Sequence, residues 1–495
     1  MKTSFLVLCS AFLLSTAGAA VGPDYRRPDI ATPLAWKQAA SAADLPRTEW
    51  WKAYADPVLD GLVTRALAAN QGLAAAAARV EQARAAAGVA RGGYFPAVGL
   101  NPSVSRARTS ETTDNRFPAA ETTTYRASLD AAWELDFFGR VRRLNEGARA
   151  EAAASAADHE SVRLALIAEV ASNYFSLRAL EREAGLVTDG AALRRRALEL
   201  VAARRANGAA TDFDVARAET ELASTEAESA ALANRRAALE HALAVLIGAD
   251  APGFELRGNE RPLLAPPAIP AGLPAELLER RPDIAAAEAS LAAANVRIGV
   301  AKAAFFPAIS LTGSFGTASG DIDRLANADS KLWSIGPSLY LPLFQGGRNR
   351  ANLARSRAAH DEAVALFRQR VLVAFREVQD GLTATQLLAD QAAAQDRAVA
   401  SARRAGALAQ TRYDAGLVNY FEVIEAQRSA LSAERAAVQL SAQRLVNSVG
   451  LVKALGGGWA TEARGGELST NTARDSSHAA GARYATANPS PDFRP

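Results

Sequence analysis

The sequence predicts an α+β membrane protein in which each chain has four transmembrane β-strands and very long α-helical hairpins. Three observations support this prediction: an internal repeat of roughly 210 residues, short segments in which apolar and polar residues alternate, and two proline-free stretches of about 67 residues each. Together they indicate a fold built twice from the same parts.

The composition is that of a globular chain rich in alanine and poor in aromatic residues. Its 495 residues include 56 Lys and Arg against 53 Asp and Glu, and the basic residues are spread among Glu and Ala. This distribution argues against nucleic acid as a partner. The single cysteine, Cys9, and the single methionine, Met1, lie at the N-terminus, so we expect neither a disulfide nor a thiolate metal site in the mature chain.

Residues 1–19 have the pattern of a secretory signal peptide. An apolar segment from Phe5 to Leu14 follows Lys2 and precedes Ala17-Gly18-Ala19, a small-residue pattern typical of a cleavage site. The apolar segment is shorter than the roughly 20 residues that a spanning helix needs, and we expect no later stretch to reach that length. The sequence therefore predicts an exported protein without a transmembrane helix.

Three landmarks recur in the same order at a nearly constant offset. In each half an aromatic-proline motif ends a helical pattern, a Gly-Arg pair follows a strand pattern, and a glycine interrupts a long helical pattern. We therefore predict two structural repeats, at residues 57–247 and 275–455. The paired landmarks are Tyr94–Val98 and Phe305–Ile309, Gly139-Arg140 and Gly347-Arg348, and Asn207-Gly208 and Ala415-Gly416.

Four segments alternate between apolar and polar residues, as strands with one apolar face do. They lie at about residues 97–107, 124–136, 308–317 and 333–343, and polar turns join each pair into a hairpin. Exported strands of roughly ten residues with one apolar face are typical of a transmembrane β-barrel. The residues predicted to face lipid are Tyr125, Leu129, Trp133, Leu135, Ile309, Leu311, Trp333, Leu339 and Leu341.

Two long stretches without proline, 140–206 and 348–414, carry apolar residues in steps of three and four. At 1.5 Å per residue, each would form a helix about 100 Å long, which an ordinary globular domain does not accommodate. Each is expected to end at a glycine turn and to return as a second helix, giving the hairpins 140–247 and 347–455. The predicted N-caps of the returning helices are Thr211 or Asp212 and, in the second repeat, Asn419.

Segments rich in proline and glycine are predicted to form a small mixed equatorial collar, because these residues interrupt helical periodicity. They are residues 20–56, the linker 248–274 and the start of 456–495. From Thr461 onward the sequence is polar and without periodicity, which predicts disorder.

Four strands are too few to close a barrel, since an open edge in lipid leaves backbone donors and acceptors without partners. Three copies would supply about twelve strands and a helical tube that continues the pore. Taken singly, an alternating strand is more often half of a soluble sandwich, and a long alanine-rich helix is more often a coiled coil. The combination with an export signal favours a channel.

Motifs along nearly the whole chain resemble a known family. The sequence is similar to the outer-membrane channels of bacterial tripartite efflux pumps, the TolC-like factors of resistance-nodulation-division systems, and to their NodT/OprM-like branch. The motifs are, in order, Gly22–Tyr25 with Pro28, Trp50-Trp51 with Asp56-Pro57, Glu279–Ile284, Leu341–Phe344 with Gly346–Arg348, and Lys453–Trp459.

This resemblance implies a trimer with a twelve-stranded β-barrel in the outer membrane and an α-barrel that crosses the periplasm. It implies a tip that docks a periplasmic adaptor and, through it, an inner-membrane resistance-nodulation-division pump. It also implies passive export of drugs or other small molecules, without a cofactor or enzymatic activity. The residues expected to dock the adaptor are Gly208, Thr211, Asp212, Gly416 and Asn419.

The resemblance further implies a gated periplasmic constriction formed by Asn419, Phe421 and Glu425, in which Phe and Glu replace the Leu and Asp usual in the family. Three Phe421 side chains would exclude water from a narrow aperture, and three Glu425 carboxylates would attract cations. From the residues alone, the plainer interpretation is that Phe421 packs between helices and Glu425 pairs with Arg428.

One departure from the family concerns the membrane anchor. Members of this branch usually carry a lipidated cysteine just before the Val-Gly-Pro-Asp-Tyr block, whereas this sequence has Ala19 there. We therefore expect cleavage by the ordinary signal peptidase and no attached lipid.

Other classes of function stay open on the sequence. An enzyme is disfavoured because the four histidines are far apart, and Arg280, Arg281 and Asp283 are better explained as helix-start residues. A periplasmic coiled-coil adaptor should have one helical hairpin instead of two. An outer-membrane duct for protein secretion or metal efflux is a further alternative, and the sequence identifies neither the substrates nor the adaptor and pump.

Overall fold

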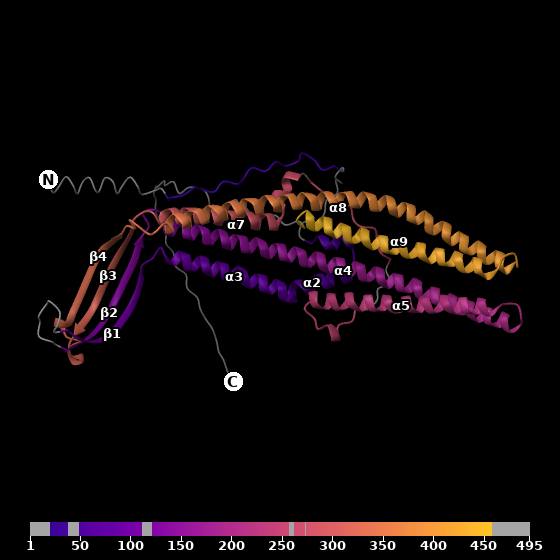
Figure 1. Ribbon diagram of the computed structural model, residues 1–495, viewed down its shortest axis with the longest axis horizontal. Helices are drawn as coiled ribbons and strands as arrows, with labels where there is room; N and C mark the ends of the chain where they lie inside the picture. Colours follow the sequence, from indigo (N-terminus) through magenta and orange to yellow (C-terminus); the bar gives the residue numbers. More distant parts are fainter. Residues whose placement is uncertain (1–19, 38–48, 111–120, 257–261, 273, 458–495) are drawn as a thin grey trace, which may run out of the picture. The chain divides into compact units, whose positions relative to one another are not determined.

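The computed structural model describes residues 20–37, 49–110, 121–256, 262–272 and 274–457. The predicted signal peptide, part of the N-terminal collar segment and the chain after residue 457 lie outside these residues. Within them, the chain is mostly helical and carries one four-stranded sheet (Figure 1).

A single sheet contains the strand hairpins of both repeats. Its strands are β1 (Ala97–Arg108), β2 (Glu121–Leu135), β3 (Ala308–Ser319) and β4 (Lys331–Tyr340). All neighbouring strands are antiparallel, and the order β1-β2-β3-β4 joins the two repeats through β2 and β3. β1 and β4 therefore form the edges of the sheet.

The register places most large apolar residues of the four strands on one face, whereas Leu332 and Tyr340 of β4 lie on the other. Leu129 of β2 lies opposite Leu100 of β1 and Phe315 of β3, and Phe315 lies opposite Trp333 of β4. Residues two apart along a strand share a face, so this face contains the residues predicted to face lipid, with one exception. Besides Leu129 and Trp333 they are Tyr125, Trp133, Leu135, Ile309, Leu311 and Leu339.

The exception is Leu341, which lies outside the strand. β4 ends at Tyr340, whose partner Ala308 is the first residue of β3, so the ladder has no partner for Leu341. Pro342 follows, and proline has no amide hydrogen with which to continue the pairing. The expectation that this strand extends to residue 343 is therefore wrong.

The opposite face of the sheet carries mainly small polar side chains and a few charges. Asn101 donates a hydrogen bond of 2.6 Å to Asp130, and Arg126 donates one of 3.3 Å to Ser314. The sheet therefore has one apolar face and one hydrophilic face, which is the pattern of a strand layer between lipid and water.

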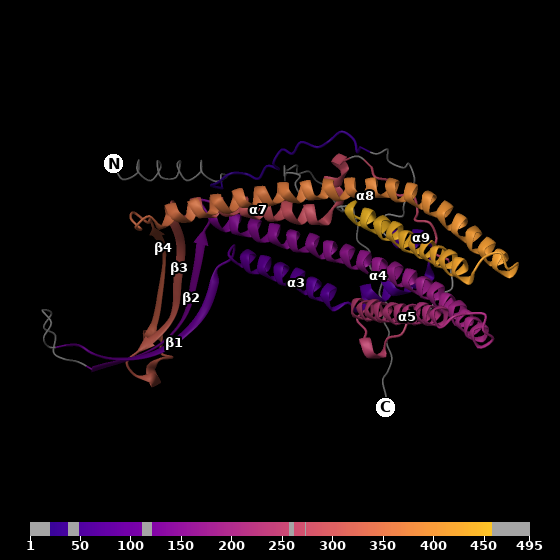
Figure 2. The same cartoon turned by 45° about the vertical axis from the view of Figure 1, so that its right-hand side comes forward.

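Two helical hairpins contain most of the described residues. α4 (Arg140–Ala206) and α8 (Arg348–Asp414) have 67 residues each, and the returning helices α5 (Asp212–Leu246) and α9 (Tyr420–Ala454) have 35 each. α4 and α5 lie side by side, as do α8 and α9 (Figures 1 and 2). The ends of α4 and α8 coincide with the two long stretches expected from the sequence.

Two shorter helices, α3 (Gln71–Gly92) and α7 (Pro282–Ala303), precede β1 and β3. Among the described residues, α7 is the one helix that is long and apolar enough to cross a membrane, by length and composition alone. The expectation that no later stretch reaches this length is therefore wrong. Half of its most apolar window is buried, and it packs against α4 and α8, as a core helix does.

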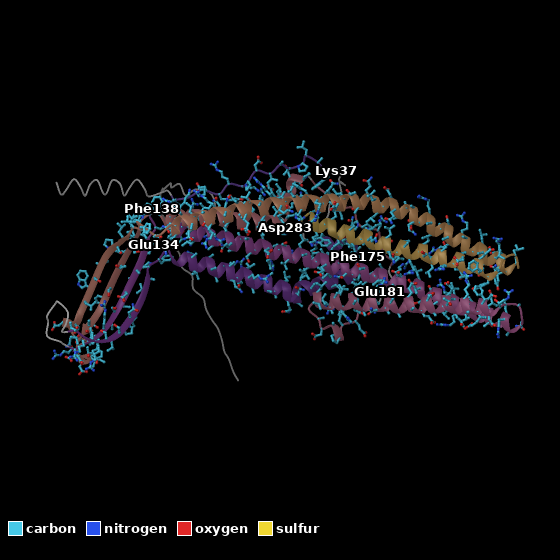
Figure 3. All side chains as sticks on the ribbon, in the orientation of Figure 1. Lys37, Glu134, Phe138, Phe175, Glu181 and Asp283 are labelled. Atoms are coloured by element: carbon cyan, nitrogen blue, oxygen red, sulfur yellow. The ribbon has the colours of Figure 1, made fainter. Side chains whose placement is uncertain are left out.

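A capped corner joins the sheet to the first long helix. Gly139 has a φ of +78°, a left-handed conformation that glycine adopts at little cost. Asp136 accepts a hydrogen bond of 3.0 Å from the amide of Val141, in the first turn of α4. Phe138, labelled in Figure 3, stacks on Phe306 with ring centroids 4.9 Å apart. The strand-to-helix corner of the first repeat therefore contacts the turn between α7 and β3 in the second repeat.

The hydrophobic core lies where both hairpins meet η1 (Trp50–Tyr54) and α2 (Pro57–Ala69). Tyr54 packs against Phe175 of α4, with ring centroids 5.0 Å apart, and its hydroxyl shares a hydrogen bond of 2.7 Å with Ser448 of α9. Burial raises the pKa of Tyr54 to about 12, although the hydrogen bond with Ser448 opposes the shift. The tyrosine therefore stays neutral at ordinary pH.

The charged motif around Arg281 has a structural role. Arg281 pairs with Asp283 at 2.7 Å and with Glu377 of α8 at 2.7 Å, and it donates to the carbonyl oxygen of Ala454 at 2.9 Å. These contacts connect the start of α7 to α8 and to the end of α9. The arrangement agrees with the interpretation of Arg281 and Asp283 as helix-start residues, since Arg281 is the N-cap of α7 and Asp283 lies in its first turn.

Candidate functional site at the helical hairpin turns

The first hairpin turn is fixed by a reciprocal cap. Gly208 follows α4 with a φ of +72°, as the residue after a helix commonly does. Thr211 is the N-cap of α5, and its hydroxyl accepts a hydrogen bond of 3.2 Å from the amide of Asp214. The Asp214 carboxylate accepts one of 2.8 Å from the amide of Thr211. This capping box satisfies two amides that a helix start otherwise leaves free.

Two charged residues complete the first turn. Asp212 is the first residue of α5, not its cap, and its carboxylate pairs with Arg205 of α4 at 2.7 Å. Hydrogen bonds from the Thr211 side chain and backbone hold the pKa of Asp214 below its usual value. The returning helix therefore begins with two carboxylates near its positive end, which is a favourable arrangement.

The second hairpin turn has the same path with looser contacts. Gly416 has a φ of +71°, and Asn419 is the N-cap of α9, accepting from the amide of Glu422 at 3.4 Å. Tyr413 at the end of α8 packs edge-on against Tyr420 at the start of α9, with ring centroids 5.0 Å apart. The residues predicted to dock a partner thus lie in two equivalent turns.

Phe421 and Glu425 lie one turn apart on α9, and Arg217 of α5 contacts both. The Cζ atom of Arg217 is 3.6 Å from the centroid of the Phe421 ring, and its Nη2 atom is 3.6 Å from Oε1 of Glu425. Phe421 is 38% exposed. We call these three residues the Arg217 cluster.

Arg428 extends the charged contacts of this cluster. Its Nη1 atom lies 3.9 Å from Glu425 and 3.9 Å from Glu221 of α5. The pairing of Glu425 with Arg428 that the residues alone favour is therefore present. Glu425 therefore contacts two arginines, Arg428 on its own helix and Arg217 of α5, and the sequence did not predict the contact with Arg217.

The internal repeat contains a pattern that could have drawn attention to Arg217. The long helices of the two repeats start at Arg140 and Arg348, and this offset aligns residue 213 with 421 and residue 217 with 425. The pattern of Phe followed four residues later by a charged residue therefore occurs twice. The charge is Arg on the first returning helix and Glu on the second.

A buried ion cluster connects the hairpins farther along the helices. Glu183 of α4 is 2% exposed and accepts from Arg435 of α9 at 2.7 Å and from Gln439 at 3.1 Å. Arg435 also pairs with Glu228 of α5 at 2.5 Å. This cluster fixes α9 against both helices of the first hairpin.

Between this ion cluster and the turns, the two hairpins are not fully packed. A cavity of about 240 Å³ lies among α4, α5 and α9. Its lining includes Leu193, Ala218, Tyr420 and Leu431. Near the turns, contacts between the hairpins therefore depend on a few side chains at the surface.

The described residues contain no group of three His, Cys, Asp or Glu side chains placed to hold a metal ion. His159 and His360 each lie beside a neighbouring carboxylate, at 3.2 and 3.4 Å, on different long helices.

Comparison with known proteins gives the family. The family model of the outer membrane efflux protein matches residues 62–249 and 273–457. The chain is 37% identical to the outer membrane protein OprJ of Pseudomonas aeruginosa, covering 92% of this chain and 97% of that protein. It is 32% identical to the cation efflux system protein CusC of Escherichia coli, over 92% of this chain and 98% of that protein.

Solved structures agree with this result. The outer-membrane channel OprN superposes with a TM-score of 0.82 at 33% identity, covering 89% of this chain and 99% of that chain. The open state of the Neisseria gonorrhoeae outer-membrane channel MtrE superposes with a TM-score of 0.80 at 31% identity, covering 89% of this chain and 98% of that chain.

The fold and these similarities define a channel subunit of the bacterial outer membrane that extends into the periplasm. The chain belongs to the outer membrane efflux protein family. It is the outer-membrane component of an efflux system, and the resemblance noted in its motifs is confirmed.

Proposed function

We propose that three copies of the chain form the exit duct of a tripartite efflux pump, which conducts drugs or other small molecules passively from the periplasm to the exterior. The observation that carries this proposal is the sheet with one apolar face and two open edges, β1 and β4. In lipid those edges need partners. Pairing β4 of one subunit with β1 of the next gives twelve strands in a closed barrel, an even number in the usual range.

In this assembly the apolar face of the sheet contacts lipid and the hydrophilic face lines water. Trp333 is 74% exposed in the single subunit, and Phe315 beside it is also exposed. Such a patch is unfavourable in water and suits a hydrocarbon layer. The long hairpins would continue the pore as an α-barrel. The described parts of the predicted collar segments would contribute to a collar around it, namely residues 20–37, 49–56, 248–256, 262–272, 274 and 456–457.

We assign the two hairpin turns to adaptor docking. The expected docking residues Gly208, Thr211, Asp212, Gly416 and Asn419 all lie in these turns. Each turn also presents one large apolar side chain, Phe213 in the first and Leu417 in the second, both 71% exposed. Exposed apolar residues with charged neighbours suit a protein partner. The partner is a periplasmic adaptor linked to an inner-membrane resistance-nodulation-division pump.

The same end of the hairpins would hold the gate. Phe421 and Glu425 supply an apolar ring and an acidic ring in a trimer, and Asn419 starts the helix that carries them. Small organic molecules are the substrate class that we favour. The only sulfur-containing residues, Met1 and Cys9, lie in the predicted signal peptide, so the mature chain would offer no soft ligand to copper or silver.

The native mass of protein extracted from outer membranes in mild detergent tests the assembly. A trimer is expected. A monomer that stays soluble without detergent would contradict both the barrel and the duct, because it would show that the apolar face needs no lipid.

Conductance across a planar lipid bilayer tests the gate. The variant with Phe421→Ala and Glu425→Ala should conduct more than the wild type, because both rings are lost. Glu226→Ala is a matched control, since Glu226 is an exposed residue of α5 that pairs with Arg195 and not with the gate residues. Equal conductance of the double variant and the wild type would refute the assignment.

A further inference from the structure

We propose that Arg217 is a positioning residue that holds the periplasmic constriction closed, by fixing Phe421 and Glu425 of α9 against α5 within one subunit. The inference rests on the proposed gate, since it assigns a role to the residue that holds the gate residues. It concerns a contact between the two repeats of a single chain.

The geometry of the Arg217 cluster joins two kinds of contact in one side chain. The guanidinium carbon lies 3.6 Å from the Phe421 ring centroid, well within the range of a cation–π contact. One guanidinium nitrogen lies 3.6 Å from the Glu425 carboxylate. Arginine can do both because its charge is spread over a planar group, whereas the lysine ammonium is a compact point charge.

The contact depends on an aromatic side chain at position 421. Leucine would be apolar but has no π system, so it would offer a guanidinium only dispersion contact. Phe421 supplies the apolar ring that a dewetted constriction needs and also a face to which Arg217 is attracted. The phenylalanine and the arginine are therefore parts of one contact.

Arg217 extends from the better fixed of the two returning helices. The capping box of Thr211 and Asp214 fixes the first turn of α5, and the Asp214 carboxylate lies one turn before Arg217 on the same helix. The other charged groups near the cluster are Glu221 of α5 and Arg428 of α9. An outward movement of α9 would break the contacts of Arg217 with both gate residues at once.

Other contacts between the hairpins near the turns involve exposed arginine side chains. Arg428 lies 3.9 Å from Glu221. Arg204 of α4 contacts the ring and hydroxyl of Tyr413 at the end of α8.

The cavity among α4, α5 and α9 begins beside the cluster, with Ala218 and Tyr420 in its wall. Packing contributes as well, since Val423 of α9 and Ala218 of α5 are buried. The contacts of Arg217 differ in that they act on both gate residues, so they shift the balance between closed and open positions of α9. Farther along, the buried cluster around Glu183 keeps α9 attached to the first hairpin.

Bilayer conductance of Arg217 variants, each first shown by native mass to be trimeric, tests the proposal. Loss of one exposed cation–π contact changes an equilibrium constant by about two- to fivefold. Because the trimer has three copies of the contact at one aperture, the combined change in the closed–open equilibrium is about 10- to 100-fold. Arg217→Ala should therefore raise the open fraction by about that factor. Arg217→Lys should give an intermediate rise, because it keeps the charge and loses the planar face. Arg195→Ala, an exposed arginine of α4 paired with Glu226, should behave as the wild type.

A second substitution separates the ring contact from the ion pair. In a Phe421→Leu background, Arg217→Lys should change the open fraction less than it does in the wild type, because the ring contact is already lost. Equal effects of Arg217→Lys in both backgrounds would overturn the cation–π contact as the source of closure.

The remaining outcomes distinguish this inference from the gate itself. If the Phe421→Ala, Glu425→Ala double variant opens the channel and Arg217→Ala does not, the gate stands and the role of Arg217 is refuted. If neither variant changes conductance, the constriction lies elsewhere and both proposals fall. Should Arg217→Ala not assemble, Arg217→Lys and Phe421→Leu still decide the question.

Discussion

The two hairpins of this chain have equal lengths and equivalent turns, but the first is fixed more firmly than the second. Both turn glycines have φ values near +70°, at +72° and +71°. The first turn has a capping box with hydrogen bonds of 3.2 and 2.8 Å, whereas Asn419 in the second turn accepts one of 3.4 Å. The first hairpin turn thus has a reciprocal capping box, whereas the side-chain cap of the second turn is a single, longer hydrogen bond.

The long helix of the first hairpin, α4, also has more buried residues than its counterpart α8. Buried residues of α4 extend from Val141 to Val201. Those of α8 are concentrated between Phe367 and Leu382, with Ala409 as a further one. Within a single subunit, the long helix of the hairpin that carries the proposed gate therefore has fewer buried residues than its counterpart in the first hairpin. Regions with few buried contacts are those in which movement costs least.

The largest effect is expected from removing the ion cluster that ties the second hairpin to the first. Arg435→Ala leaves the buried carboxylate of Glu183 without its charged partner, at a cost of about 3 to 5 kcal/mol in the free energy of unfolding. Denaturant unfolding in detergent measures the change. Arg403→Ala is the control, because the Arg403 side chain is exposed and its pair with Glu434 is worth about 1 kcal/mol at most. Similar losses in both variants would show that the hairpins are not coupled through Glu183.

A leucine on each long helix tests the difference in burial. Leu177 of α4 is fully buried, so Leu177→Ala should lower the free energy of unfolding by about 3 kcal/mol. Leu387 of α8 is exposed in the single subunit, so Leu387→Ala should leave subunit unfolding nearly unchanged and weaken the trimer instead. Unfolding curves and native mass at increasing detergent measure the two effects. If Leu387→Ala left the trimer as stable as the wild type, this part of α8 would lie outside the subunit interface.

The caps provide a smaller test of the same contrast. Thr211→Ala should destabilise the first turn of α5 by about 1 kcal/mol. Asn419→Ala should cost less at α9, because its hydrogen bond is longer. Amide hydrogen exchange at each helix start measures both effects. Thr220→Ala is a matched control, because Thr220 lies in α5 after its first turn and its hydroxyl donates to the carbonyl oxygen of Ala216. Equal exchange in the two turns of the wild type would remove the distinction between an anchored and a looser hairpin.

The smallest expected effect depends on pH. The pKa of Asp214 is lowered from its usual 3.8 by hydrogen bonds from Thr211. A lowered pKa means that the stabilisation is complete above the ordinary value and is lost as pH falls through the lowered one. Exchange protection of the first turn of α5 should fall in that acid range, and Asp214→Asn should abolish the transition. A protection profile that Asp214→Asn leaves unchanged would assign the transition to another group.

Much of the fold follows from pattern in this sequence because helices and strands are local. The steps of three and four in 140–206 and 348–414 predicted helices whose ends coincide with α4 and α8. Strand ends were less predictable, since β4 stops where β3 no longer offers a partner. The role of the apolar helix α7 was also not predictable, because composition alone does not distinguish a buried core helix from a membrane-spanning helix.

At the candidate site, sequence and resemblance located Phe421 and Glu425 but not Arg217. Their partner lies more than 200 residues away on another hairpin, and single-helix spacing reveals only neighbours such as Arg428. The offset of the repeat aligns Arg217 with Glu425, so aligning the two returning helices position by position would have suggested the pair.

The open edges of β1 and β4 have a consequence for inheritance. Each subunit would contribute both edges to a shared barrel, so one defective edge damages the whole assembly. In a cell that makes normal and edge-defective chains in equal amounts, only about one trimer in eight would consist of normal chains alone. Mutations at these edges are therefore expected to be dominant, whereas mutations that prevent a chain from reaching the membrane should be recessive.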